Sequence, residues 1–207
     1  MSTDNDPEMV AALVAALPTV DTATTDALRA RLAQQAERDG LLDVAYRTVD
    51  SPFGPLLVAA TSEGLVRVAF DREGHDAVLT NLATAISPRI LRTPSRTDDV
   101  ARQLDEYFAG RRRRFDLPVD LRLVRGFRRA VIAHLPDIPY GSTESYADVA
   151  RAAGNPAAVR AVGSACSHNP VPLVVPCHRV VRSDGSFGQY LGGPETKAAL
   201  LTMEATA

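Results

Sequence analysis

Disulfide chemistry is the first thing that the sequence lacks. Cys166 and Cys177 are the only cysteines among 207 residues, so we expect two free thiols and a reducing compartment, which points to the cytoplasm. These cysteines and the four scattered histidines also show no zinc-ligand spacing. We therefore expect neither a disulfide framework nor a bound metal.

Membrane signals are missing as well. No apolar segment approaches the roughly 20 residues that cross a bilayer. The N-terminus carries Asp4, Asp6 and Glu8 where a secretory signal would be basic, so we expect no such signal. Apolar residues still make up 45% of the chain, which is enough to build a core in one large domain or two small ones.

The net charge of -2 hides an asymmetry between the two halves of the chain. Residues 1–110 carry 10 basic and 17 acidic side chains, whereas residues 111–207 carry 13 basic and 8 acidic ones. The basic half could meet a polyanion, although ordinary scatter of surface charge would give the same count. The run of four arginines at 111–114 likewise fits either a phosphate-binding patch or a solvated linker.

The pattern of apolar residues divides the chain into three predicted parts and favours the α+β class. Residues 1–40 are predicted to form a helical N-terminal extension, with one short helix near residues 7–17 and a second that ends near Gly40. Residues 41–114 are predicted to form a small α/β domain with an antiparallel sheet. Residues 122–207 are predicted to form a mostly helical C-terminal domain.

Residues 44–48 alternate between apolar and polar positions, and residues 56–61 and 65–70 form apolar runs. Turn residues separate these segments, which predicts a three-stranded antiparallel meander. Helical patterns follow at about residues 75–86 and 97–109. A further helix is predicted to start at Gly126 and to stop at Pro136.

Two short helices with a tight turn are predicted next. Residues 143–153 have a helical pattern that Gly154 would end, and Asn155-Pro156 would cap and start a second helix over residues 157–167. This is a helix-turn-helix pattern, although a helical hairpin inside a core looks the same. The second helix is rich in small residues and offers only Arg160 as a long polar side chain, which favours minor-groove approach with little sequence preference.

The pentapeptide Pro176-Cys177-His178-Arg179-Val180 places a thiol beside an imidazole, after the uncharged apolar run at residues 171–175. A cysteine becomes a strong nucleophile when a nearby base removes its proton. A buried structural cysteine would give the same local pattern, so the surrounding residues have to decide.

Together these segments resemble the O6-alkylguanine-DNA alkyltransferases, also called methylated-DNA–protein-cysteine methyltransferases. The resemblance is specific over about residues 122–205 and looser over residues 42–110. The positions that carry it in the C-terminal part are Ser145-Tyr146, Gly154-Asn155-Pro156, Arg160-Ala161-Val162-Gly163, Asn169-Pro170-Val171-Pro172, Pro176-Cys177-His178-Arg179-Val180-Val181, Gly185, Gly188, Tyr190, Gly192-Gly193 and Lys197.

The resemblance implies DNA repair by direct reversal. The alkyl group of O6-alkylguanine in double-stranded DNA, with O4-alkylthymine as a further candidate lesion, would pass once and irreversibly to Cys177 after the nucleotide rotates out of the helix. It implies a protein that needs no cofactor and is consumed by a single reaction. We expect a monomer.

The resemblance also implies roles for the residues around the nucleophile. His178 would act as the base for Cys177 through a water, and Glu204 would orient His178. Lys197 would balance charge near the guanine. Outside the resemblance, Glu204 would be an ordinary solvated helix residue and Lys197 an ordinary surface lysine.

A second group of residues would contact DNA. Arg160 is similar to the family's arginine finger, which fills the gap left by the rotated base. Tyr146 is similar to the tyrosine that crowds the target phosphate, although a buried helix aromatic is the ordinary alternative. We add Ala157 and Arg179 to the predicted DNA contacts.

A third group would line the slot for the rotated base, and its predicted members are Asn169, Cys166, Pro172, Val180, Tyr190 and Leu191. Asn169 resembles the hinge asparagine between the DNA-reading helix and the active-site segment, and it could equally be a turn residue. Leu191 stands where the family often has a small hydroxyl residue, which bears on the width of the slot.

Two other functions use the same residues. A cysteine hydrolase could employ Cys177, His178 and Glu204, but it would need an oxyanion hole and would leave Arg160 and the helical hairpin unexplained. A non-catalytic lesion-binding protein is the second alternative, and in proteins of that kind the reactive cysteine is replaced.

Overall fold

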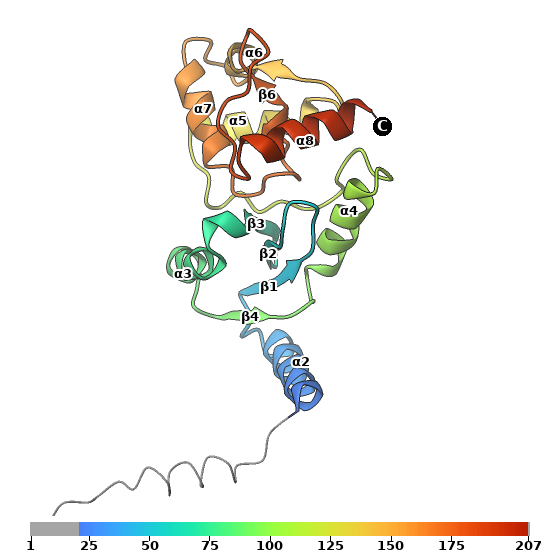
Figure 1. Ribbon diagram of the computed structural model, residues 1–207. Helices are drawn as coiled ribbons and strands as arrows, with labels where there is room; N and C mark the ends of the chain where they lie inside the picture. Colours follow the sequence, from blue (N-terminus) through green and yellow to red (C-terminus); the bar gives the residue numbers. More distant parts are fainter. Residues whose placement is uncertain (1–20, 207) are drawn as a thin grey trace, which may run out of the picture.

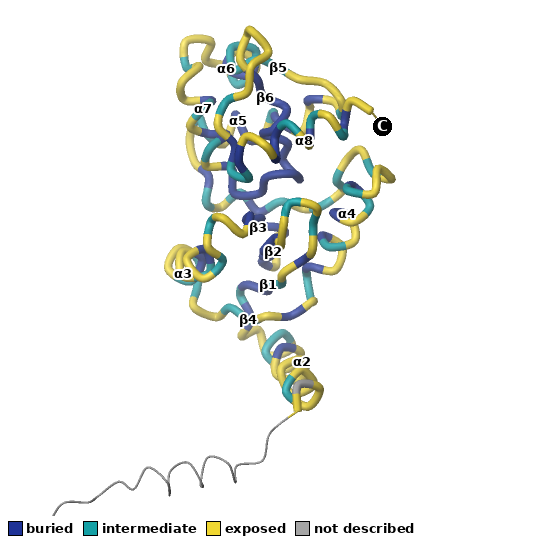
Figure 2. Tube along the Cα trace, in the orientation of Figure 1, coloured by how far each residue is buried: buried dark blue, intermediate teal, exposed yellow. Residues whose placement is uncertain are grey.

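The computed structural model describes residues 21–206, so the helix predicted near residues 7–17 lies outside the described residues. Helix α2 (Thr22–Arg38) confirms the second predicted helix of this part, and the Asp21 carboxylate caps it by accepting a hydrogen bond from the Thr24 N–H at 2.6 Å. Leu28 and Leu32 are 56% and 60% exposed, so these two leucines do not pack into the core. Figure 2 shows the same helix as mostly exposed.

The predicted meander is confirmed as three antiparallel strands. They are β1 (Val44–Val49), β2 (Leu56–Thr61) and β3 (Gly64–Phe70). A fourth strand, β4 (Ile90–Arg92), pairs in parallel with β1 and gives the sheet the order β3-β2-β1-β4. Sequence patterns did not predict β4, because three half-exposed or exposed residues carry too little periodicity.

Both faces of the sheet are covered, which is why its strands read as nearly continuous apolar runs. Helix α3 (His75–Ala85) packs on one face, where Leu57 and Ala59 point. Leu56 and Val58 point to the other face, into the larger core that also contains residues of helix α4 (Asp98–Phe108). In Figure 1 the sheet lies between α3 and α4, and the C-terminal part lies above it.

The segment between the two parts is tied to the sheet. The Leu65 N–H donates to the Pro118 carbonyl at 2.8 Å, and the Asp120 N–H donates to the Leu65 carbonyl at 2.8 Å. Gly64 has a φ of +136°, and a Cβ at this position would lie 2.3 Å from the Pro118 oxygen. A glycine is therefore needed where the connection crosses the strand.

The C-terminal part is mainly helical, which with the sheet confirms the α+β class. Helix α5 (Phe127–His134) and the turn η2 (Leu135–Asp137) form where a helix was predicted, and helix α8 (Pro194–Ala205) ends the described chain (Figure 1). Between them lie α6 (Tyr146–Ala152) and α7 (Val159–Ser167), which form the predicted hairpin. The remaining short elements are η1 (Asp71–Glu73), β5 (Glu144–Ser145), η3 (Cys177–Arg179) and β6 (Val180–Val181).

Two details of the hairpin differ from expectation. Residues 144–145 form β5, which pairs with β6, so α6 starts only at Tyr146 and is capped by Ser145. Helix α7 is capped by Ala158 without any side-chain hydrogen bond, and Asn155 makes a turn instead, with its carbonyl accepting from the Ala158 N–H at 3.0 Å. Gly154 does end α6, at a φ of +83°.

Among residues 21–206, no helix has both the length and the apolar character needed to cross a membrane.

Candidate functional site

The segment that leads to Cys177 is buried and cross-braced. Asn169 lies at its start, fully buried, and its amide donates to the Val175 carbonyl at 2.8 Å while its side-chain oxygen accepts from the Val171 N–H at 3.1 Å. Leu173 adopts a φ of +73°, a left-handed conformation that strains a branched side chain. The side chain of Asn169 therefore holds both ends of a strained loop in place.

Cys177 is 2% exposed, in the 3₁₀ turn η3. Burial raises the pKa of its thiol to about 11, although a hydrogen bond with Asn169 and the positive charge of Lys197 act in the opposite direction. Near neutral pH the sulfur is therefore a thiol at rest. It becomes a nucleophile only if a base takes its proton during the reaction.

His178 and Glu204 form a buried pair as the resemblance implies. Both side chains are 0% exposed, and His178 Nε2 lies 2.9 Å from Glu204 Oε1. Burial alone would raise the pKa of Glu204, but hydrogen bonds from His178, Arg179 and Tyr107 hold that pKa well below its usual range. The carboxylate is thus a permanent acceptor, which assigns the ring proton to Nε2 of His178.

The other ring nitrogen of His178 is free to act as a base. Nδ1 is buried and has no hydrogen-bond partner among the described residues. Burial lowers the pKa of His178, and the hydrogen bond and charge of Glu204 oppose that effect. A neutral imidazole with an unpaired Nδ1, next in sequence to a buried thiol, can accept a proton and be stabilised by Glu204.

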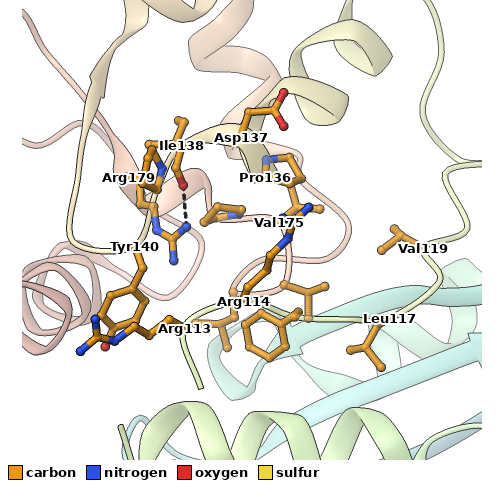
Figure 3. A pocket seen from close by; sticks show the side chains of 15 residues that line it. Arg113, Arg114, Leu117, Val119, Pro136, Asp137, Ile138, Tyr140, Val175 and Arg179 are labelled. Carbon is orange, nitrogen blue, oxygen red and sulfur yellow. Dashed lines mark hydrogen bonds between the residues drawn. The ribbon is translucent and has the colours of Figure 1, made fainter. Parts of the chain in front are cut away.

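Arg179 corrects one of the predicted DNA contacts. Its side chain is 7% exposed, and its Nε and Nη2 atoms donate to the two oxygens of Glu204 at 2.8 and 2.9 Å. Its Nη1 donates to the Ile138 carbonyl at 2.8 Å, the bond drawn in Figure 3. The assignment of Arg179 to DNA is wrong, because the guanidinium lies inside the protein and each of its three nitrogens already donates a hydrogen bond to Glu204 or Ile138.

Lys197 is buried, not on the surface. It is 0% exposed and donates from Nζ to the Val180 carbonyl. Burial lowers its pKa, whereas the neighbouring thiols of Cys177 and Cys166 act in the opposite direction. The Lys197 ammonium group thus lies close to the nucleophile, where its charge would favour the thiolate.

Tyr146 and Arg160 lie together at a surface hollow of about 490 Å³ formed mainly by α6, α7 and residues 182–189. Burial raises the pKa of Tyr146 to about 12, so its hydroxyl stays protonated. The hydroxyl packs so closely on Gly188 that a Cβ there would lie 2.1 Å from it. Arg160 is exposed on α7 at the same hollow, and Ala157 is exposed just before that helix.

The predicted slot residues divide into two groups. Cys166, Val180 and Tyr190 are buried in the core cluster that also holds Cys177, and Pro172 is buried as well. The Tyr190 ring meets the His178 ring edge-on at a centroid distance of 6.1 Å, and its hydroxyl has no partner within the described part of the chain. Leu191 is only half-buried and lines a different hollow with Pro170 and Arg67, so the structure does not bring it to the Tyr146 side.

Besides Arg179, sequence patterns missed two further partners of Glu204. The Tyr107 hydroxyl donates to Oε1 at 2.6 Å, and the Gly141 N–H donates to Oε2 at 3.3 Å. Tyr107 occupies an apolar position of α4 and looks like any core aromatic in the sequence. Its role in the site could only come from the packing of α4 against α8.

The arginine run at 111–114 lies beside this network. Arg111 and Arg112 pair with Asp105 and Glu106 of α4, at 3.1 and 2.8 Å, which fits the linker interpretation for these two. The guanidinium of Arg113 lies 5.7 Å from the centre of the Tyr140 ring, in a cleft of about 400 Å³ shown in Figure 3. Within residues 21–206, no group of three or more acidic, histidine or cysteine side chains could hold a metal ion.

Comparison with known proteins gives a consistent result over most of the chain. A family model described as the ribonuclease-like domain of 6-O-methylguanine DNA methyltransferase matches residues 44–121. A model described as the DNA binding domain of the same protein matches residues 126–206. Together the two models match well over half of the sequence.

Individual relatives agree with the family models. A methylated-DNA–protein-cysteine methyltransferase of Mycobacterium bovis is 41% identical over 173 residues, which cover 78% of this chain and 92% of that protein. The constitutive methylated-DNA–protein-cysteine methyltransferase of Bacillus subtilis is 38% identical, covering 77% and 94%. A crystal structure of Mycobacterium tuberculosis OGT in complex with DNA superimposes with a TM-score of 0.66 at 36% identity, covering 78% and 93%. None of this supports a cysteine hydrolase or a non-catalytic lesion-binding protein.

Proposed function

Because the chain belongs to the 6-O-methylguanine DNA methyltransferase family, it acts in DNA repair by alkyl transfer from DNA to a cysteine of its own, and we propose that this cysteine is Cys177. The proposed donor is O6-alkylguanine in a duplex, with O4-alkylthymine as a second lesion. The single observation that carries the assignment is the buried His178–Glu204 pair, which leaves an unpaired ring nitrogen on the residue that follows a buried thiol in sequence.

The proposed reaction is one displacement at an sp³ carbon. His178 Nδ1 takes the thiol proton of Cys177 through a bridging water, and the thiolate sulfur attacks the alkyl carbon. The carbon–O6 bond breaks, its electron pair passes to the guanine, and the proton held by His178 returns to the purine. The atoms balance between protein and lesion alone, and the thioether that forms is not reduced, so each molecule reacts once.

Nucleotide rotation is the second part of the proposal. An alkyl group on a stacked guanine cannot reach a buried sulfur, so the base must leave the helix at a cost of roughly a few kcal/mol. Arg160 is proposed to enter the gap and Tyr146 to press on the backbone beside it. The exposure of Arg160, the small residues of α7 and the hollow beside Tyr146 support this arrangement.

The finer organisation is also a proposal. We propose a helical extension at residues 1–40, an α/β domain at 41–114 and a DNA-binding alkyltransferase domain at 122–207. The protein is proposed to work in the cytoplasm, where free thiols stay reduced, and to be a monomer. Light scattering during size exclusion tests the monomer, and a mass equal to two chains contradicts it.

The decisive experiment is the intact mass of the protein after mixing with duplex DNA that carries O6-methylguanine. We expect one methyl group per chain, mapped to the peptide that contains Cys177, and no further gain with excess DNA. Cys177→Ala should accept none, whereas the matched variant Cys166→Ala should still accept one equivalent. A folded, reduced wild-type protein that gains no methyl group would overturn the proposal, and continuous hydrolysis of an ester would favour a hydrolase instead.

A further inference from the structure

Tyr107 joins the sheet-containing part of the chain to the proposed active site. It lies on α4, is 0% exposed, and its ring packs against Phe108, Phe115 and Tyr140 with centroid distances of 5.4, 5.2 and 6.2 Å. Its hydroxyl nevertheless points out of this aromatic cluster and donates to Glu204 Oε1 at 2.6 Å, across 97 positions of sequence. The ring is held by packing against other aromatic rings, and the hydroxyl hydrogen-bonds only to Glu204 among the described residues.

The oxygen that Tyr107 reaches is the one that holds His178. Glu204 Oε1 accepts from His178 Nε2 at 2.9 Å, from Arg179 Nη2 at 2.9 Å and from Tyr107 at 2.6 Å. Burial, followed by the charge of Glu204, raises the pKa of Tyr107 far above its usual range, so the hydroxyl remains a donor at any working pH. Each donor on this oxygen draws on the negative charge that Glu204 would otherwise offer to His178.

We propose that Tyr107 is a positioning residue for the alkyl transfer: its hydroxyl fixes Glu204 and limits how strongly Glu204 stabilises the protonated form of His178. Helix α4 would then complete an active site whose nucleophile and base lie in the C-terminal part. This inference rests on the proposed function, because it assigns His178 as the base.

Charged and titratable groups from three segments surround His178. Glu204 and Lys197 come from α8, Arg179 is its neighbour in η3, and Tyr190 meets its ring from the preceding loop of α8. Of these, only Glu204 raises the pKa of His178, whereas Arg179 and Lys197 lower it. Removing a donor from Glu204 leaves more of its charge for His178, so the pKa of His178 should rise.

Tyr107→Phe removes the hydroxyl and keeps the ring. Glu204 would retain its donors from His178, Arg179 and Gly141, so the variant is expected to fold. The matched control is Tyr140→Phe, which removes a neighbouring buried hydroxyl that has no partner among the described residues. Both variants lose one oxygen from the same aromatic cluster, and only one of these oxygens touches Glu204.

The test is the pH dependence of two reactions of the full-length protein: methyl transfer from O6-methylguanine DNA, and alkylation of Cys177 by iodoacetamide in a Cys166→Ala background. The acid limb of both profiles should move to higher pH in Tyr107→Phe, by about half a pH unit or more, because a charge-assisted hydrogen bond to Glu204 is lost. The Tyr140→Phe profiles should superimpose on those of the unsubstituted protein. Unfolding in urea, followed in parallel, identifies any loss that is purely one of stability.

The outcomes separate the two levels of the proposal. Superimposable profiles for Tyr107→Phe and the unsubstituted protein would overturn the positioning role, as would an equal shift in Tyr140→Phe. If the unsubstituted protein transfers no methyl group, the proposed function fails, and the iodoacetamide profiles still decide whether Tyr107 is coupled to His178. Lower stability with an unmoved acid limb would make Tyr107 a packing residue only.

Discussion

The His178–Glu204 network and the hollow at Tyr146 and Arg160 are built in opposite ways. The three side chains that donate to Glu204, those of Tyr107, His178 and Arg179, are buried, and the Gly141 N–H donates to the same carboxylate. Arg160, in contrast, is exposed and makes no side-chain hydrogen bond or ion pair within residues 21–206. The first region is complete without DNA, whereas the proposed partner of the second is DNA.

This difference teaches that changes in the two regions should have different consequences. A change in the buried network should affect both folding and chemistry, because the same hydrogen bonds serve both. A change at the exposed hollow should leave folding intact and affect only reactions that require a duplex. Four predictions test this contrast, in order of decreasing effect.

Glu204→Gln should have the largest effect. It leaves the buried guanidinium of Arg179 without its carboxylate, and breaking a buried pair in this way costs about 3–5 kcal/mol of unfolding free energy. Methyl transfer should also slow by about a hundredfold or more, since His178 loses the charge that stabilises its protonated form. Urea unfolding and single-turnover transfer measure the two losses.

Asp99→Asn is the matched control for that change. Asp99 pairs with Arg102 on the surface of α4, where its side chain is 76% exposed. Its loss should change neither stability nor transfer appreciably, because solvent screens an exposed pair. Equal effects of the two substitutions would mean that the buried network has no special weight.

Arg160→Ala should slow repair of duplex DNA by about tenfold to a hundredfold, because the side chain offsets part of a rotation cost of a few kcal/mol and each tenfold corresponds to about 1.4 kcal/mol. Reaction with a free alkylated guanine base, which needs no rotation, should be nearly unchanged. Unfolding in urea should be unchanged as well. The control is Arg151→Ala, because Arg151 is an exposed arginine of α6 that does not line the hollow. Equal losses of Arg160→Ala on duplex DNA and on the free base would contradict the finger role.

Cys177 should make the protein sensitive to alkaline pH. Its thiol pKa is about 8.5 in an unfolded chain and about 11 in the folded protein. The folded state therefore keeps a proton that the unfolded state loses, so this stabilisation is complete below about pH 8.5 and is lost as the pH rises toward 11. The unfolding free energy of Cys177→Ala should fall less steeply than that of the unsubstituted protein over this interval. If the unfolding free energies of the two proteins fall equally with pH, the thiol is not held in the buried, protonated state.

Leu28→Ser and Leu32→Ser should have the smallest effect. Both leucines are more than half exposed on α2, away from both regions compared above. Stability should change by no more than about 0.5 kcal/mol, as at other surface positions, and methyl transfer should be unchanged. A clear loss of transfer would show that α2 takes part in the reaction.

Most of the secondary structure could be predicted from the sequence, because the signals for it are local. Strands β1 to β3 and helices α3 to α5 follow from periodicity and turn residues over short windows. The His178–Glu204 contact was also anticipated, but only through resemblance, since no local pattern links positions 178 and 204. Strand β4 and the start of α6 were missed because each depends on a partner strand distant in sequence.

Two residues that bind Glu204 have roles that their residue type does not show. Arg179 was predicted to contact DNA, and Tyr107 looks like an ordinary core aromatic of α4. The structure reverses the expected exposure of the arginine and gives the tyrosine a polar partner. Burial and hydrogen-bond partners are properties of the packed chain, so residue type alone could not predict them.

The sequence by itself determined the chemistry that this protein can perform: a thiol beside an imidazole, a following carboxylate and an arginine on a helix of small residues. Only the tertiary structure decided the state of those groups. Packing of α8 against residues 177–179 buries the thiol, the imidazole and the carboxylate, and Tyr107 of α4, together with His178 and Arg179, supplies the donors that keep Glu204 charged. Proton affinity depends on solvation and on neighbours in space, and both exist only once the chain has folded.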